Sequence, residues 1–365
     1  MDRSLSLPAR QGGPGTRLSG HRNSKPRGIL TLTLSVALLF TLSGVAQAVT
    51  YSELANHWAP VWRQDTAGKY REDYIAAVNF DGDWRGNNNW ENTYNYKQFA
   101  YVYYAVAETP THYFITYADF HPRDWNNAWL GGCGPDPDCH ENDMEGAMVV
   151  VRKDGSPYGA FHLMETQAHG NFYQFTNDPA ITTGSDNVDA GVAFENGKNP
   201  VLYVESKGHG VCSDLYSSTF TCSHTPGTFP GGDGVIYRVG SVAQYPSDLG
   251  HSTGKVTSAT YVLKPMEELW SRRCNIGNGQ LYDKPFTYQG ARNSFTYSIG
   301  GAFDGDTKGD DAANPPWGWD DGDDGPAYKG DWFLDPAYTI ETHLNGLGTF
   351  SLDYTYNPWL ASTTC

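Results

Sequence analysis

The chain has 365 residues, a formal net charge of −16 at pH 7, and many aromatic residues, with 24 Tyr, 16 Phe and 11 Trp. Such an acidic surface repels phosphate backbones and anionic lipid headgroups, which excludes nucleic acid as a partner class. Aromatic-rich sequence that is punctuated by 41 Gly and 21 Pro is typical of an all-β domain.

The first 48 residues have the three parts of a secretory signal. Six basic residues precede an apolar run from Ile29 to Val45, and Ala46-Gln47-Ala48 supplies a small-x-small cleavage pattern. The rival interpretation is an uncleaved anchor, but this run is at the short limit of the roughly 17–25 residues that span a bilayer. We expect cleavage after Ala48, no stable membrane span, and a secreted, extracellular mature protein. Its net charge would be −21, because the leader carries six basic residues and one acidic residue.

Short runs of apolar and aromatic residues predict strands along the mature chain. Runs such as Ala147–Val151 are apolar on both faces, which favours two packed sheets. We predict an all-β fold, a two-sheet β-sandwich with long decorated loops and few short helices, the helices lying at 51–57 and 265–272. Residues 49–365 would form one domain, in which 241–365 are either an integral half or a separate subdomain. The predicted strands are 101–107, 113–120, 146–152, 158–165, 201–206, 235–239, 259–263 and 350–356.

All six cysteines lie after the expected cleavage point. An even count in an exported chain predicts disulfide bonds. No Cys-x-x-Cys pair is present, which argues against a tetrahedral cysteine site for zinc. Local spacing favours the pairs Cys133–Cys139, Cys212–Cys222 and Cys274–Cys365.

The most informative segment surrounds His140, Asp143 and Glu145 and leads into a predicted strand. On a strand, residues 143 and 145 point the same way, with Cβ atoms roughly 7 Å apart. Two carboxylates and one imidazole suit a divalent metal cation, with Mg²⁺, Ca²⁺, Mn²⁺ and Zn²⁺ not distinguished. The alternative is an ordinary solvated polar loop.

This segment also resembles two protein families. The string His-Glu-Asn-Asp-Met-Glu at 140–145 resembles the His-Glu-Gly-Asp-Trp-Glu signature of Vps62-like proteins. Stretches at 57–61 and 199–210 resemble segments of that family in the same order. The string is also similar to the Gly-His-Arg-His-Asp-Trp-Glu heptapeptide of necrosis-inducing (NPP1-type) secreted proteins.

The second resemblance implies a β-sandwich with an acidic cavity that holds a divalent cation. It places His140, Asp143 and Glu145 at ligand positions and His209 at a further family histidine. Cys139, Asn142 and Met144 replace the Gly, His and Trp of the heptapeptide. The upstream Asp ligand of that family has three candidates here, Asp119, Asp136 and Asp138.

These features predict a secreted protein that acts on an extracellular glycan or cell-surface target, as a binding or toxin-like protein. The alternative is a secreted metal-assisted hydrolase of esters, phosphoesters or glycans, with His140, Asp143, Glu145 and His209 as catalytic residues and His140 or His209 as general base. A third hypothesis is a serine esterase using Ser252 in a G-x-S-x-G pattern. The sequence does not predict an oligomeric state.

Two further sets of residues are candidates to extend the site. The acidic stretch 304–335 contains interleaved tryptophans, and aromatic faces beside carboxylates suit sugars or cations. The alternatives are a solvated acidic loop and tryptophans that fill the core. His162 or His169 would approach the site from a neighbouring strand.

Overall fold

Short strands make up most of the regular structure in the computed structural model, which describes residues 49–125, 139–292, 296–306, 313–321, 329–360 and 365. The helices are α1 (Tyr51–Trp58), η1 (Gly86–Asn88), α2 (Asn89–Asn92), η2 (Pro246–Leu249), α3 (Glu267–Trp270), η3 (Pro316–Gly318), α4 (Asp331–Leu334) and α5 (Pro336–His343). The strands are β1 (Val61–Asp65), β2 (Tyr101–Glu108), β3 (His112–Arg123), β4 (Glu141–Arg152), β5 (Ala160–Ala168), β6 (Asn171–Phe175), β7 (Thr182–Thr183), β8 (Val188–Ala190), β9 (Phe194–Glu195), β10 (Asn199–Val204), β11 (Val211–Ser213), β12 (Gly234–Val239), β13 (Val256–Pro265), β14 (Pro285–Gln289), β15 (Thr296–Gly300) and β16 (Leu344–Asn345).

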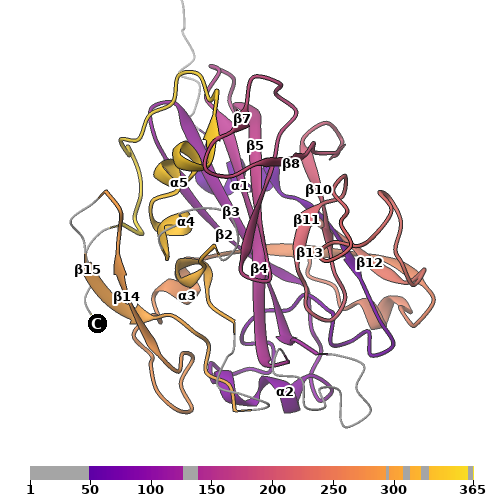
Figure 1. The fold of residues 1–365 in the computed structure, drawn as a ribbon. Helices are drawn as coiled ribbons and strands as arrows, with labels where there is room; N and C mark the ends of the chain where they lie inside the picture. Colours follow the sequence, from indigo (N-terminus) through magenta and orange to yellow (C-terminus); the bar gives the residue numbers. More distant parts are fainter. Residues whose placement is uncertain (1–48, 126–138, 293–295, 307–312, 322–328, 361–364) are drawn as a thin grey trace, which may run out of the picture. The chain divides into compact units, whose positions relative to one another are not determined.

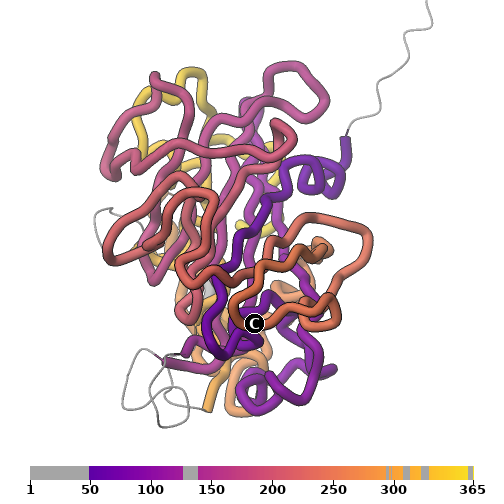
Figure 2. The backbone as a smooth tube through the Cα atoms, turned by 90° about the vertical axis from the view of Figure 1, so that its right-hand side faces the viewer, coloured from indigo at the N-terminus to yellow at the C-terminus, as the bar shows by residue number. Residues whose placement is uncertain are grey.

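One large sheet runs through the described chain in the order β11-β10-β1-β12-β13-β2-β3-β4-β5-β6-β8, and β9 pairs with β10. Strand β13 joins its two halves (Figure 1). Residues 256–261 of β13 pair with β12, and residues 262–265 pair with β2. The hydrogen bonding is therefore continuous from one half of the sheet to the other. Figure 2 shows the early strand β1 lying among later segments, in keeping with its pairing to β10 and β12.

Two hydrophobic cores lie on opposite faces of strands β2 to β6. The sheet curls, so that β11 contacts β4 and β5, and the first core fills the space between the two halves. The second core lies on the other face of β2 to β6, where the C-terminal segment with α3, α4 and α5 covers it. Among the largest buried side chains, Trp62, Tyr203 and Tyr237 belong to the first core, and Trp317, Trp332 and Tyr282 belong to the second.

Strand β4 is apolar on both faces because it lies between these two cores. Met148 and Val150 point into the second core, whereas Ala147, Val149 and Val151 point into the first. All five side chains are fully buried. The alternation of a strand thus sends successive residues to two different apolar layers.

The β-rich class with few short helices is confirmed, but two separate sandwich sheets are not, because β13 connects the halves by backbone hydrogen bonds. Strands form at seven of the eight predicted places. In the remaining place, 350–356, Tyr356 makes an isolated bridge to Glu108. The predicted N-terminal helix is α1, which Thr50 and Glu53 cap reciprocally. The predicted helix at 265–272 is shorter, since Pro265 ends β13 and α3 begins at Glu267.

Two of the predicted disulfides, Cys212–Cys222 and Cys274–Cys365, are present. The third prediction involves Cys133, which lies outside the described residues, as does the predicted leader 1–48. By their contacts, residues Ala48–Cys365 form one compact unit. Within the part of the chain that is described, no helix has the length and apolar character needed to cross a membrane.

Candidate functional site

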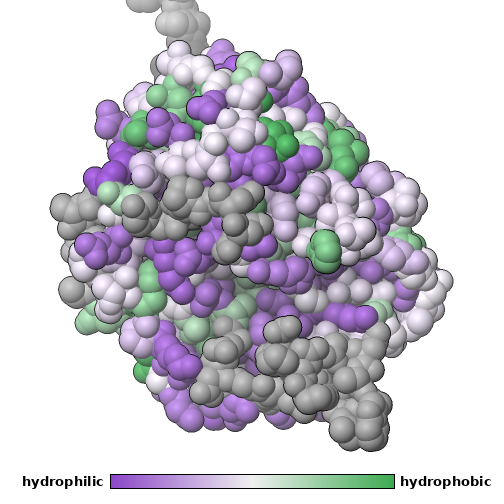
Figure 3. All heavy atoms as spheres, in the orientation of Figure 1, coloured by the Kyte–Doolittle hydropathy of each residue, from purple (hydrophilic) through white to green (hydrophobic). Residues whose placement is uncertain are grey.

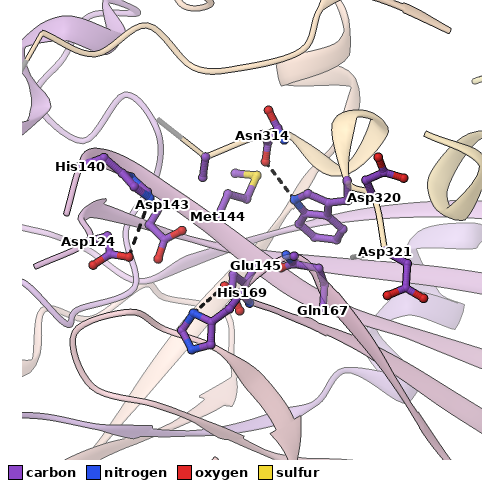
Figure 4. Close-up of a pocket in the computed structure, with 13 residues that line it drawn as sticks. Asp124, His140, Asp143, Met144, Glu145, Gln167, His169, Asn314, Asp320 and Asp321 are labelled. Atoms are coloured by element: carbon purple, nitrogen blue, oxygen red, sulfur yellow. Dashed lines mark hydrogen bonds and ion pairs between the residues drawn. The ribbon is translucent and has the colours of Figure 1, made fainter. Parts of the chain in front are cut away.

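A cavity of about 620 Å³ lies beside the first residues of β4 (Figure 4). In the described chain β5 pairs with β4 from Gly146 onwards, because the chain turns back at His169. Residues 141–145 therefore have no β5 partner, and the carbonyl of Asn142 accepts a hydrogen bond from the N–H of Ala313 instead. In the orientation of Figure 1, hydrophilic residues gather across the middle of the surface (Figure 3). The cavity is lined by Asp124, His140, Asp143, Met144, Glu145, Gln167, His169, Gly170, Ala313, Asn314, Trp319, Asp320 and Asp321.

The antiparallel register of β3 and β4 brings four ionisable side chains to one face. His121 is opposite Asp143, and Asp119 is opposite Glu145. Because alternate residues of a strand share a face, Asp143 and Glu145 point the same way, in agreement with the spacing argument. All four side chains are buried.

His209 lies behind Asp143 and is fully buried. Its Nδ1 is 2.8 Å from Oδ2 of Asp143, and its Nε2 is 3.4 Å from Oδ1 of Asp73. Burial by itself would lower the pKa of His209, but the hydrogen bonds and charges of the two carboxylates outweigh it and raise the pKa to about 10. The two carboxylates therefore favour the charged form of the ring, which is hydrogen-bonded to Asp143 through Nδ1.

A second buried pair supports His209 from the side. The His121 ring stacks on the His209 ring with centroids 3.8 Å apart, and His121 Nε2 lies 3.1 Å from Asp119 Oδ2. Burial and the neighbouring charge of His209 lower the pKa of His121 well below its usual value. The stacked pair therefore carries its positive charge on His209.

Glu145 is held by two backbone donors. The N–H of His169 donates to Oε1 at 2.8 Å, and the N–H of Val211 donates to Oε2 at 3.1 Å. Burial and then the charge of Asp143 raise the pKa of Glu145. For Asp143, burial raises the pKa, but the hydrogen bond from His209 and its charge outweigh this and lower it. Asp143 is thus the carboxylate that stays ionised most readily.

His140 and Asp124 form the other end of the cavity (Figure 4). His140 Nε2 lies 3.7 Å from Asp124 Oδ2, and both side chains are 17% exposed. The N–H of Asp124 also donates to the carbonyl of His140 at 2.9 Å, which ties the end of β3 to the start of β4. Asp124, His140 and Asp143 therefore lie together, next to Glu145 and His169, while Asp320 and Asp321 lie at the opposite end.

The cavity lining also includes an aromatic residue and two amide side chains, those of Gln167 and Asn314. The acidic stretch 304–335 contains Trp317, Trp319 and Trp332, and of these Trp319 lines the cavity. Its Nε1 donates to the carbonyl of Asn314 at 2.9 Å. Trp317 and Trp332 are core residues with no exposed surface. The buried Oε1 of Gln167 has no hydrogen-bond partner among the described residues. The lining therefore includes an acceptor and an aromatic ring.

The structure places the four predicted site residues as follows. Asp143, Glu145 and His140 line the cavity, and His209 lies beneath Asp143. Their ligand atoms do not form the tightest cluster in the described chain. Among the described His, Cys, Asp and Glu side chains, a group that brings its ligand atoms within 4.8 Å of one another consists of Asp186, Asp321 and His343.

Sequence reasoning missed Asp124. Of the three upstream candidates, Asp119 is fully buried beneath the site, and Asp136 and Asp138 lie outside the described residues. The register of β3 and β4, continued past the pair Arg123–Glu141, sets residue 124 opposite residue 140. Recognising 112–123 and 141–152 as two arms of one hairpin would have identified Asp124. The suggestion that His169 approaches the site is confirmed, whereas His162 pairs with His112 elsewhere.

The Ser252 pattern lacks the setting that a serine nucleophile needs. The short helix η2 precedes it and β13 follows it. A nucleophile elbow requires a strand before the serine and a helix after it. The order of elements here is the reverse, so the pattern belongs to a surface turn.

No family model and no curated protein matches this chain. Three solved structures are similar to part of it. One is described as "Toxin fold for microbial attack and plant defense", with 14% identity, a TM-score of 0.27, and coverage of 47% of this chain and 70% of that one. Another is NLPPya in complex with glucosamine, with 15% identity, a TM-score of 0.29, and coverage of 49% and 74%. The third is Necrosis and Ethylene inducing Protein 2 from the causal agent of cocoa's Witches Broom disease, with 13% identity, a TM-score of 0.27, and coverage of 49% and 75%.

Likenesses at these TM-scores do not define how the strands of this chain are arranged. One of the three is a necrosis-inducing protein, the second kind of protein that the motif at 140–145 resembles. The Vps62-like resemblance finds no family or sequence match and stays a prediction.

Proposed function

We propose that this protein is exported, binds a divalent cation in the cavity through Asp124, His140, Asp143 and Glu145, and uses it to bind an extracellular glycan. The observation that carries the proposal is the presence of these four side chains in one cavity. The two disulfides fit an oxidising extracellular location.

The donor set fits a cation. Three carboxylates and one imidazole offer hard oxygen ligands with a single nitrogen, a combination that suits Mg²⁺, Ca²⁺ or Mn²⁺ and also accommodates Zn²⁺. Asp143 and Glu145 point to the same side from one strand, and Asp124 lies beside His140 on the adjoining chain end. A cation here would offset the repulsion between neighbouring carboxylates.

His209 acts in this scheme as a positioning residue. Both of its nitrogens face carboxylates, and it is not among the residues that line the cavity. Its hydrogen bond fixes the orientation of Asp143, much as outer-shell partners orient metal ligands. The role is thus different from the general base that the sequence suggested for this residue.

The glycan part of the proposal rests on two other residues of the lining, Gln167 and Trp319. A sugar presents hydroxyl groups and an apolar ring face, and protein sites for such ligands combine a few placed polar groups with aromatic surface. The unsatisfied Oε1 of Gln167 is an acceptor for a hydroxyl, and Trp319 supplies the aromatic surface. Cation and sugar would share the cavity.

Metal analysis of the purified protein tests the shared premise. The wild-type mature protein should retain about one equivalent of divalent metal more than the Asp143→Asn variant. Asp353→Asn is the matched control, because Asp353 is exposed and lies far from the cavity. The N–H of the nearby Ser351 donates to the hydroxyl of Thr111, which directly precedes β3 at the end of that strand away from Asp143. Equal metal content in all three proteins would contradict the proposal. Binding of amino sugars and plant or microbial glycans, with and without chelator, then tests the ligand.

One observation favours the hydrolase alternative. His169 lines the cavity with a 40% exposed side chain, and its Nε2 lies 2.7 Å from Oε2 of Glu205. A carboxylate-oriented imidazole beside a metal is an arrangement for general-base catalysis. Hydrolysis of esters, phosphodiesters or polysaccharides that His169→Gln abolishes and a chelator inhibits would support this function. If none of these substrates is hydrolysed, the hydrolase function is contradicted and the binding function remains.

A further inference from the structure

We propose a second divalent-metal site formed by Asp186, Asp321 and His343, on the far side of β4 and β5 from His209. One ligand atom from each of the three side chains lies within 4.8 Å of the other two. The three residues come from the β7–β8 connection, the segment after η3, and the end of α5. This site is independent of the motif at residues 140–145.

Two of the three ligands are held by backbone hydrogen bonds between their own segments. The N–H of Asp186 donates to the carbonyl of His343 at 3.2 Å, and the N–H of Gly184 donates to the same carbonyl at 2.9 Å. The pairing of β16 with β7, Leu344 opposite Thr183, continues this connection. Asp186 and His343 therefore keep their relative position without a metal, as a preorganised site requires.

Glu165 orients the imidazole. Oε1 of Glu165 lies 2.9 Å from Nδ1 of His343, and Oε2 accepts a hydrogen bond from Nε1 of Trp332 at 3.0 Å. Nδ1 also lies 3.9 Å from Oδ2 of Asp186, and when it donates to Glu165 the lone pair of the ring is on Nε2. A histidine whose other nitrogen donates to a carboxylate is the usual form of a metal-bound histidine.

The charge of this group also points to a cation. Glu165, Asp186 and His343 are at most 2% exposed. Glu165, Asp186 and Asp321 are carboxylic acids, and His343 is the one member of the group of four that can carry positive charge. Ionised carboxylates that are removed from water require a compensating charge. A divalent ion would supply it at the point where the three ligands converge.

The ligand set predicts the class of ion and the kind of site. Two carboxylates and one imidazole suit a borderline ion such as Zn²⁺ or Mn²⁺ better than an ion that prefers oxygen alone. Three protein ligands are the number found in sites that keep a position for water or substrate. Of the three, Asp321 also lines the cavity.

The test uses Co²⁺ as the probe on mature protein that has been stripped with chelator. The wild-type chain should bind two equivalents, whereas Asp321→Asn and Asp143→Asn should bind one each. Glu165→Gln should weaken the affinity of the second site about tenfold to hundredfold without changing the first. Asp321 is the safest ligand to replace, because it is partly exposed and lies in a connecting segment.

The two sites fail separately in this design. If Asp321→Asn loses one equivalent and Asp143→Asn loses none, the second site stands and the first is wrong. If Asp321→Asn and Glu165→Gln bind Co²⁺ like the wild type, the second site is overturned. A readout that needs no variant is the paramagnetic shift of labelled histidine signals. His343 should shift with Co²⁺, and an unshifted His343 signal would also overturn the proposal.

Discussion

The Nδ1 atom of His209 lies 2.8 Å from the Oδ2 atom of Asp143, although the two residues are 66 positions apart in the chain. The same ring faces Asp73 on its other side, and Asp73 also accepts hydrogen bonds from Nε1 of Trp125 and the N–H of Lys207. A buried charged imidazole thereby joins three separate segments beneath the cavity. The geometry of the candidate metal ligands depends on this buried support.

Replacing His209 should therefore destabilise the fold. In His209→Asn the carboxylates of Asp143 and Asp73 lose their shared cationic partner, and breaking a buried ion pair costs about 3–5 kcal/mol. Urea unfolding of metal-free protein measures the effect. His140→Asn is the matched control, because His140 is partly exposed and its loss should cost below about 1 kcal/mol. Equal losses in the two variants would contradict the supporting role of His209.

Asp124 should contribute to cation affinity although it is not part of the motif. Asp124→Asn is expected to weaken binding at the first site by more than about tenfold, which corresponds to about 1.4 kcal/mol. Equilibrium dialysis with Mn²⁺ provides the measurement. Asp320→Asn serves for comparison, since Asp320 lines the same cavity at its other end. A loss of affinity in Asp320→Asn with none in Asp124→Asn would reverse the assignment.

Gly146 is the position in β4 where a side chain is least tolerated. A Cβ atom there would lie 2.1 Å from the carbonyl oxygen of Tyr117 and 3.1 Å from the ring of Trp319. Because the nearest contact is backbone within the β3–β4 pair, Gly146→Ala should cost more than about 3 kcal/mol. Gly68→Ala, which meets nothing within 4 Å, should leave the unfolding midpoint unchanged. A stable Gly146→Ala protein would show that β3 and β4 separate easily.

The stability of the fold should fall in mild acid because of His112. Burial, and then the nearby His162, lower the pKa of His112 to about 3. The unfolded chain takes up this proton near pH 6.5, so the free energy of unfolding is fully present above that pH and decreases as pH falls towards 3. Unfolding curves between pH 8 and pH 4 should show a smaller decrease for His112→Asn than for the wild type. Parallel pH profiles would rule out this contribution.

Local patterns in the sequence were sufficient for seven of the strands, most of them long, and for part of the site. The alternation that places Asp143 and Glu145 on one face is a property of any strand, and the apolar run 147–151 required layers on both sides. The continuity of the sheet was not predictable in this way. It depends on β13, whose two halves have different partners, and neither half differs in composition from an ordinary strand.

Site residues from distant segments could likewise not be predicted from local sequence patterns. Asp124 follows from strand register, which the sequence specifies only when both arms of the hairpin are recognised. Asp186 and His343 are 157 positions apart and meet because β7 pairs with β16, two strands of two residues each. Strands of that length leave no periodic signal. The Trp residues of 317–332 divided between core and cavity for reasons of packing alone.

The position of β13 has a consequence for how the chain acquires its structure. Its pairs join Val262 to Tyr101, and β1 likewise pairs Val61 with Val201, so the neighbours of early strands are synthesised more than a hundred residues later. Non-local pairings of this kind fold slowly and leave strand edges exposed in the meantime. Until residues 262–265 have been made, β2 has no partner on one side. A newly made chain would therefore need protection along that edge until β13 has emerged.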